Sequence, residues 1–134
     1  MTITHRFTRG WTPGSGLGFS RTTEKTADGE NNRIVPVAAG VQNKAVALTI
    51  DVSQLKGLAL LSDKAVKIET NSSSVPANIF NLAAGVPVIW FDGDPALLDT
   101  EGGAVTTDVT QIFITNDGDE DAEVQIGVLV DATV

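Results

Sequence analysis

The sequence contains no cysteine, no tyrosine and only one histidine. Without cysteine the chain has no disulfide framework, no thiolate nucleophile and no thiolate ligand for a metal. No apolar run approaches the ~18 residues that a membrane-spanning helix needs, so we expect no membrane partner. The first residues, MTITHRFTRGW, are polar, and we see no apolar core of a signal peptide in them.

Basic residues are missing from the last third of the sequence. From Asp92 onward there is no Lys or Arg, whereas residues 1–33 hold Arg6, Arg9, Arg21, Lys25 and Arg33. The net charge is −8, and phosphate backbones repel such a chain, so we expect no nucleic-acid partner. A basic front and an acidic back suit contacts between neighbouring molecules; the alternative is an ordinary soluble surface.

The apolar residues follow the spacing of strands and not of helices. A chain of 134 residues suits one domain with a substantial core. Its apolar residues alternate with polar ones or form short runs, which predicts an all-β fold, an antiparallel β-sandwich of jelly-roll-like form. The expected strands cover residues 2–9, 18–27, 32–38, 45–52, 55–62, 65–71, 77–82, 86–91, 109–116 and 122–130.

Three local patterns predict how these strands connect. Asp63-Lys64 separates 55–62 from 65–71 and predicts a hairpin. The last two strands, 109–116 and 122–130, predict a second hairpin, and PALLDTE (95–101) predicts a short helical turn.

The first thirty residues stand apart in composition. GWTPGSGLG (10–18) is rich in Gly, Ser and Pro and separates the first apolar segment from the rest. We therefore divide the chain into residues 1–30, an extended N-terminal arm or first strands, and residues 31–134, the β-sandwich domain. Both interpretations of the first segment stay open.

Two acidic segments are candidate ion sites. The tip at 117–121, within NDGDEDAE, has neither the spacing nor the helical context of an EF-hand loop, and Asn-Asp-Gly is typical of a turn between strands. The loop DGDPALLDTE offers Asp92, Asp94, Asp99 and Glu101, and several carboxylates in one loop are a start toward a calcium or magnesium cage. Such loops are also common without ions, so the ion question stays open, and we predict no cofactor.

Catalytic patterns are scarce. His5 has no evident carboxylate or serine partner, and no G-x-S-x-G precedes a helix. Sugar clefts usually carry several aromatics, whereas Trp11 and Trp90 are the only tryptophans here. We predict that the chain is not an enzyme.

The apolar content predicts contact with other proteins. Hydrophobic residues make up 42% of the chain and charged residues 19%, against about 25% charged residues in an average protein. We expect this surplus to be buried against copies of the chain, as a dimer or trimer, or against another protein. The interface residues we predict are Phe7, Arg9 and Trp11 in the N-terminal segment and Leu97 and Leu98 in the loop 92–103, because aromatic and Arg side chains commonly anchor interfaces.

The order of several segments resembles small virion proteins of tailed bacteriophages. The matching segments, over about residues 45–134, are ALTIDVSQLKGLALLSD, TNSSSVP, LAAGVPVIW, TTDVTQIFITN and VLVDAT, with a looser match at Arg9, Trp11, Gly14 and Ser15. The resemblance implies a capsid decoration or cement protein, made in the host cytoplasm and bound to major capsid protein on the outer surface of the capsid. The alternative is a receptor- or glycan-binding module of a phage tail or fibre. The family supplies no catalytic residue.

Overall fold

The computed structural model describes residues 2–14 and 16–131. Ser15 and the last residues of the VLVDATV segment lie outside this range, as does Met1. The described residues form strands and one 3-10 turn, with no α-helix and thus no helix of a kind that would cross a membrane. The elements are β1 (Ile3–Trp11), β2 (Phe19–Ala27), β3 (Gly29–Val37), β4 (Lys44–Ile50), η1 (Val52–Gln54), β5 (Leu55–Ser62), β6 (Val66–Thr70), β7 (Ile79–Leu82), β8 (Val88–Phe91), β9 (Val109–Thr115) and β10 (Ala122–Val130).

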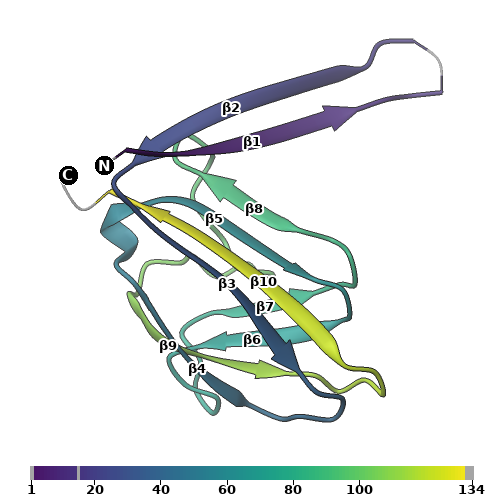
Figure 1. The fold of residues 1–134 in the computed structure, drawn as a ribbon, viewed down its shortest axis with the longest axis vertical. Helices are drawn as coiled ribbons and strands as arrows, with labels where there is room; N and C mark the ends of the chain where they lie inside the picture. Colours follow the sequence, from purple (N-terminus) through teal and green to yellow (C-terminus); the bar gives the residue numbers. More distant parts are fainter. Residues whose placement is uncertain (1, 15, 132–134) are drawn as a thin grey trace.

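Two four-stranded sheets pack face to face (Figure 1). The front sheet has the order β3-β10-β5-β8 and the back sheet the order β4-β9-β6-β7. Every neighbouring pair in both sheets is antiparallel. The predicted all-β sandwich is therefore confirmed.

The core lies between the sheets because alternate residues of each strand point inward. Burying each of these Val, Leu or Ile side chains contributes about 1.5–3 kcal/mol. The buried cluster includes Val35, Val37, Leu58, Leu60, Val124, Ile126 and Val128 from the front sheet and Val46, Leu48, Ile50, Ile68, Phe80, Ile112 and Ile114 from the back sheet.

Both hairpins expected inside the sandwich are wrong. β5 pairs with β10 and β8 in the front sheet, whereas β6 pairs with β9 and β7 in the back sheet. Likewise β9 and β10 lie in different sheets. A strand buries its one apolar face equally well whether it is followed by a hairpin or by a crossing to the opposite sheet. Polar turn residues suit both connections, so the sequence does not distinguish between them.

The helical turn expected at 95–101 is also wrong. This loop instead closes on itself, with the Val105 amide donating to the Leu97 carbonyl at 3.0 Å and a bridge between Leu98 and Ala104. The one helical turn of the described residues is η1, whose N-cap Asp51 accepts a hydrogen bond from the Ser53 amide at 3.0 Å.

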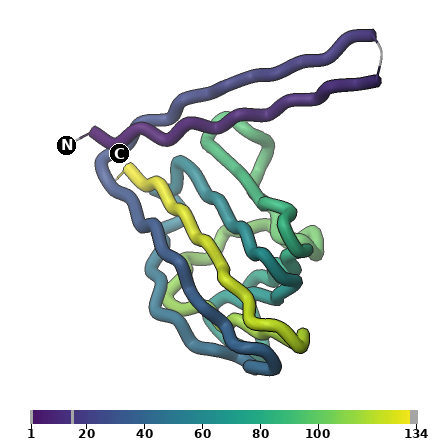
Figure 2. Tube along the Cα trace, turned by 45° about the vertical axis from the view of Figure 1, so that its right-hand side comes forward, coloured from purple at the N-terminus to yellow at the C-terminus, as the bar shows by residue number. Residues whose placement is uncertain are grey.

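Residues 3–27 form a separate two-stranded hairpin, paired from Ile3 opposite Ala27 to Trp11 opposite Phe19. We expected an extended arm or first strands over residues 1–30. The hairpin lies across one end of the sandwich, and its distal part continues beyond the sandwich (Figures 1 and 2).

Candidate protein-interaction surface

The outer face of the front sheet is organised in rows of residues that lie side by side across the strands. In β5 the residues Leu58 and Leu60 face the core, so Gly57, Ala59 and Leu61 face outward. The pairing register places three rows on this face. The hairpin row is Glu30, Leu129, Gly57 and Phe91; the middle row is Asn32, Gly127, Ala59 and Ile89; the outer row is Ile34, Gln125 and Leu61, with Pro87 just before β8.

The hairpin covers the first of these rows. Phe7 is 7% exposed, and its ring centroid lies 4.9 Å from that of Phe91. Its ring also lies over Gly57, where an added Cβ would sit only 2.7 Å from Phe7 Cζ. Leu129 is fully buried although it points away from the core. The hairpin and the sandwich therefore share a small apolar contact of their own.

Polar contacts hold the hairpin on either side of Phe7. On the β8 side, Arg9 Nη1 and Nη2 donate to the two Asp94 carboxylate oxygens at 2.9 and 2.6 Å, and the guanidinium lies 4.7 Å from the Phe91 ring centroid. On the β3 side, His5 Nε2 donates to Glu30 Oε2 at 2.7 Å. The paired geometry of Arg9 with a carboxylate is both strong and directional.

These contacts change the acidity of the carboxylates involved. The hydrogen bond from Arg9 lowers the pKa of Asp94 against the opposing effect of burial, and the same bond raises the pKa of Arg9. Hydrogen bonds from His5 and then Asn32 lower the pKa of Glu30. Asp94 and Glu30 are thus held in the charged form that the hairpin contact requires.

Beyond Arg9 the large apolar side chains among the described residues of the hairpin are exposed. Trp11 is the next residue on the Arg9 side of β1, and its partner Phe19 lies beside it with ring centroids 6.2 Å apart. Arg9 already contacts Asp94 and the Ile89 carbonyl at β8, which is the edge strand of the front sheet. Trp11 and Phe19 are 57% and 62% exposed, and Leu17 in the connecting loop is 91% exposed. We call Trp11, Leu17 and Phe19 the overhang.

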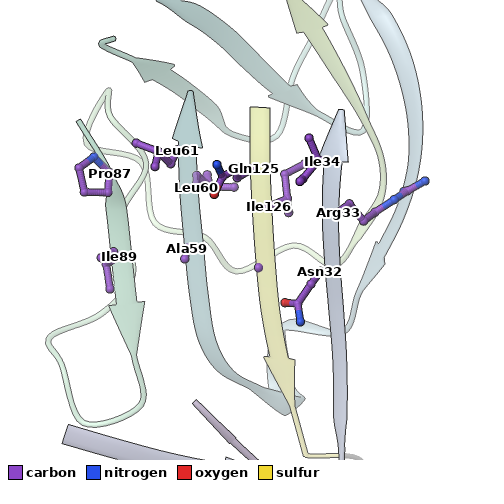
Figure 3. Close-up of a pocket in the computed structure, with 11 residues that line it drawn as sticks. Asn32, Arg33, Ile34, Ala59, Leu60, Leu61, Pro87, Ile89, Gln125 and Ile126 are labelled. Atoms are coloured by element: carbon purple, nitrogen blue, oxygen red, sulfur yellow. The ribbon is translucent and has the colours of Figure 1, made fainter. Parts of the chain in front are cut away.

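A second apolar surface lies on the open part of the front sheet. The middle and outer rows line an open groove of about 510 Å³ (Figure 3). Ala59 and Gly127 form its floor, because neither has a long side chain, and Ile34, Ile89 and Pro87 rise around it. The groove lies next to the row that the hairpin covers. The outer face of the front sheet is therefore apolar both under the hairpin and in the open part beside it.

The acidic loop after β8 does not gather its carboxylates around one point. Asp94 is held by Arg9, and Asp92 lies 3.4 Å from Lys56 Nζ. Among residues 2–14 and 16–131, no three His, Cys, Asp or Glu side chains come together as a metal site.

Asp99 has a structural role in this loop. Its Oδ1 accepts hydrogen bonds from the Glu101 and Gly103 amides at 2.9 and 2.8 Å, and its Oδ2 accepts from Asn78 Nδ2 and the Ile79 amide at 2.9 and 3.2 Å. Burial acts to raise the pKa of Asp99, but these hydrogen bonds outweigh it and lower the pKa. The carboxylate fastens the loop to the start of β7.

The acidic tip is a turn built on a buried asparagine. Asn116 is fully buried, and its Nδ2 donates to the Val37 and Glu120 carbonyls at 3.1 and 2.9 Å. Its Oδ1 accepts from the Gly118 amide at 3.0 Å, which is an Asx turn. None of residues 116–118 has a positive φ angle, so the turn is held by the Asx hydrogen bond and not by left-handed backbone.

Two acids of the 117–121 tip bind the neighbouring connection between β3 and β4. Asp121 Oδ1 accepts from the Ala39 amide at 2.9 Å, and Asp117 Oδ1 accepts from Gln42 Nε2 at 2.6 Å. These carboxylates join two connections at the end of the sandwich away from the hairpin.

The structure separates the five predicted interface residues. Phe7 is buried within its own chain against Gly57 and Phe91, so in this structure it contacts its own sheet. Arg9 makes its strongest contacts with Asp94 of the same chain. Trp11 stays exposed, Leu98 is 52% exposed, and Leu97 packs partly against the core.

The sequence alone does not indicate Phe19, Leu17 or the groove as contact sites. Phe19 begins a strand opposite Trp11, and its importance appears only with the hairpin register. The groove combines residues of four strands that meet only through the sheet order.

Comparison with known proteins gives no further assignment: no family model, curated protein or solved structure matches this chain.

Proposed function

We propose that this chain is a structural protein of a phage virion, a capsid decoration or cement protein that binds the outer surface of the capsid and bridges major capsid subunits. The proposal starts from the resemblance over residues 45–134. The observation that supports it most is the overhang, where Trp11, Leu17 and Phe19 are exposed on a hairpin that reaches past the sandwich.

The geometry of the hairpin suits a bridging role. Contacts at His5, Phe7 and Arg9 fix it to three different strands or their ends, so its distal part is carried in a defined direction. A preorganised projection loses less conformational entropy on binding than a free arm does. Exposed Trp and Phe are frequent anchors of protein interfaces.

The strand order of the sandwich agrees with this proposal. We interpret it as jelly-roll-like, because eight antiparallel strands form two four-stranded sheets and every connection except the one between β6 and β7 crosses from one sheet to the other. Such a sandwich offers a rigid body from which the hairpin extends. Many copies on one lattice add their contacts, so modest affinity for each capsid subunit gives strong retention.

Binding to assembled heads tests this proposal. Purified chain is incubated with heads assembled without it and sedimented, and cryo-electron microscopy locates the bound copies. We expect regular lattice positions on the outside of the shell, and lower occupancy for the double variant Trp11→Ser/Phe19→Ser than for Val75→Ser. Val75 is a suitable control because it is 81% exposed and lies outside the overhang.

The exposed pair Trp11 and Phe19 also suits a second function, a receptor- or glycan-binding module of a tail or fibre, because aromatic rings stack on sugars. Labelling confined to fibre tips in native particles, together with binding on a glycan array, would replace the capsid proposal with this one.

A further inference from the structure

We propose that the overhang of one molecule docks in the front-sheet groove of a second copy, and that two copies exchange these contacts in a symmetric pair. The inference rests on the bridging role proposed above and names one of the bridged subunits as a second copy. It concerns Trp11, Leu17 and Phe19 on one side and the middle and outer rows on the other.

The first argument is continuity with the contact inside one chain. Phe7 shows how this side of the hairpin binds this face of the sheet: an aromatic ring lies over a small residue, Gly57, next to an aliphatic side chain, Leu129. The groove repeats that chemistry one row further, with Ala59 and Gly127 as the small residues and Ile89 beside them. Trp11 and Phe19 therefore carry the ring type that this surface already accepts.

The direction of the hairpin indicates where the second copy lies. Its contacts run from Glu30 at β3, over Gly57 at β5, to Asp94 beyond β8. The overhang leaves the molecule across β8, the edge strand (Figures 1 and 2). A copy placed beside β8, and related by a two-fold axis perpendicular to the front sheet, receives the overhang on its own outer face. The same axis returns its overhang to the first copy.

Charge favours this occupant. Arg6, Arg9, Arg21 and Lys25 against Glu24 give residues 1–27 a net charge of +3, which leaves −11 for the rest of a chain whose net charge is −8. The overhang itself is uncharged, and Arg9, Arg21 and Lys25 lie near Phe91 and Asp94 of their own chain. The attraction therefore acts at longer range and steers the basic hairpin of one copy toward the acidic body of the other.

The size of the contact favours exchange over a single contact. Trp and Phe bury about 150–250 Å² each at most, and specific interfaces bury roughly 1,200–2,000 Å² in total. One overhang in one groove falls short of that range, whereas two reciprocal contacts reach it. We therefore expect a closed pair.

The oligomeric state of the isolated chain, without heads, tests the inference. Analytical ultracentrifugation over a concentration series is applied to the wild type, to Trp11→Ser/Phe19→Ser, and to two groove variants, Gly127→Lys and Ile89→Lys. An added Cβ at Gly127 meets its nearest neighbours at 3.4 and 3.7 Å, so the substitution fits the fold, and Ile89 is partly exposed. Val75→Ser is the control. Circular dichroism checks that each variant folds. If Gly127→Lys does not fold, Ile89→Lys alone tests the contribution of the groove.

We expect a wild-type dimer and a dissociation constant raised at least about 30-fold in overhang and groove variants alike, the size of effect typical of interface hot spots, with Val75→Ser unchanged. Benzoylphenylalanine in place of Phe19, in a mixture of ¹⁴N- and ¹⁵N-labelled chains, should crosslink to groove residues of the other copy. A wild type that stays monomeric overturns the inference. A dimer that is weakened by Trp11→Ser/Phe19→Ser but not by Gly127→Lys or Ile89→Lys also overturns it, because the overhang would then bind somewhere other than the groove. If a monomeric chain decorates the heads, the capsid proposal is supported and the proposed exchange between two copies is contradicted.

Discussion

Phe7 meets the front sheet at Gly57, where any side chain would collide with it, since a Cβ there lies 2.7 Å from Phe7 Cζ. The sequence marks Phe7 as an apolar residue of a strand, but its partner glycine lies fifty residues away. The sequence therefore marks Phe7 as a contact residue but does not indicate that the contact is with the front sheet of its own chain.

Truncation of Phe7 should destabilise the molecule. Phe7→Ala removes a buried ring that contacts Phe91 and Gly57, so we expect the free energy of unfolding to fall by about 3 kcal/mol. Urea denaturation measures the change. Phe19→Ala, which removes a ring that is 62% exposed, should cost less than about 0.5 kcal/mol. Equal losses for the two variants would contradict the assignment of Phe7 to the intrachain contact.

Substitution of Asp99 gives a second prediction for a single residue. In Asp99→Asn the amide nitrogen replaces one oxygen that now accepts from Asn78 Nδ2 and the Ile79 amide, so donors face donors. We expect a loss of about 1.5–3 kcal/mol in the free energy of unfolding. Glu101→Gln, in the same loop but exposed, serves as the matched control. A neutral effect of Asp99→Asn would mean that the loop does not depend on this carboxylate.

The hairpin is the element whose role was hardest to predict. Its two strands were expected as segments 2–9 and 18–27, and those segments agree closely with β1 and β2. Their pairing with each other and their place across the front sheet depend on His5, Phe7 and Arg9 meeting residues far away in sequence. The same holds for the sandwich. The positions of its strands followed from the alternation of apolar and polar residues, whereas the predicted pairings of β5 with β6 and of β9 with β10 were wrong.

Acid should release the hairpin before the sandwich unfolds. Because Arg9 lowers the pKa of Asp94 in the folded protein, the stabilisation is present in full above the unfolded-state value of about 3.9 and is lost as the pH falls through the lower folded-state pKa. The pKa of Glu30 is also lowered, chiefly by its hydrogen bond with His5. Hydrogen-exchange protection factors of β1 and β2 should therefore fall below about pH 4 relative to those of β10.

Asp94→Asn provides the control for this pH dependence. The variant lacks the titrating carboxylate, so its hairpin should be less protected at neutral pH and change less between pH 5 and pH 3. The same pH profile in the variant and the wild type would show that Asp94 is not the group responsible.

For the whole molecule, the sandwich holds the folding core and the hairpin covers part of one face. The all-β class followed from the periodicity of the sequence, because each strand shows one apolar face. The overhang and groove did not, because both depend on which strands are neighbours and on where the sandwich ends.

Removal of residues 1–27 tests this division. The shortened chain should keep the circular dichroism of a β-sandwich, since none of the core cluster comes from the hairpin. It should also scatter more light and associate nonspecifically, because Leu129, Gly57 and Phe91 become continuous with the groove in one exposed apolar face. A shortened chain that is unfolded would show that the hairpin belongs to the folding core.

The placement of the two indoles has a practical consequence. Trp90 is fixed by its Nε1 bond to the Pro95 carbonyl at 2.9 Å and lies against the interior, whereas Trp11 is largely in contact with solvent. With no tyrosine in the chain, ultraviolet emission comes almost wholly from these two fluorophores. One reports on integrity of the β-sandwich and the other on capture by a neighbour, so unlabelled material can be followed spectroscopically as it assembles.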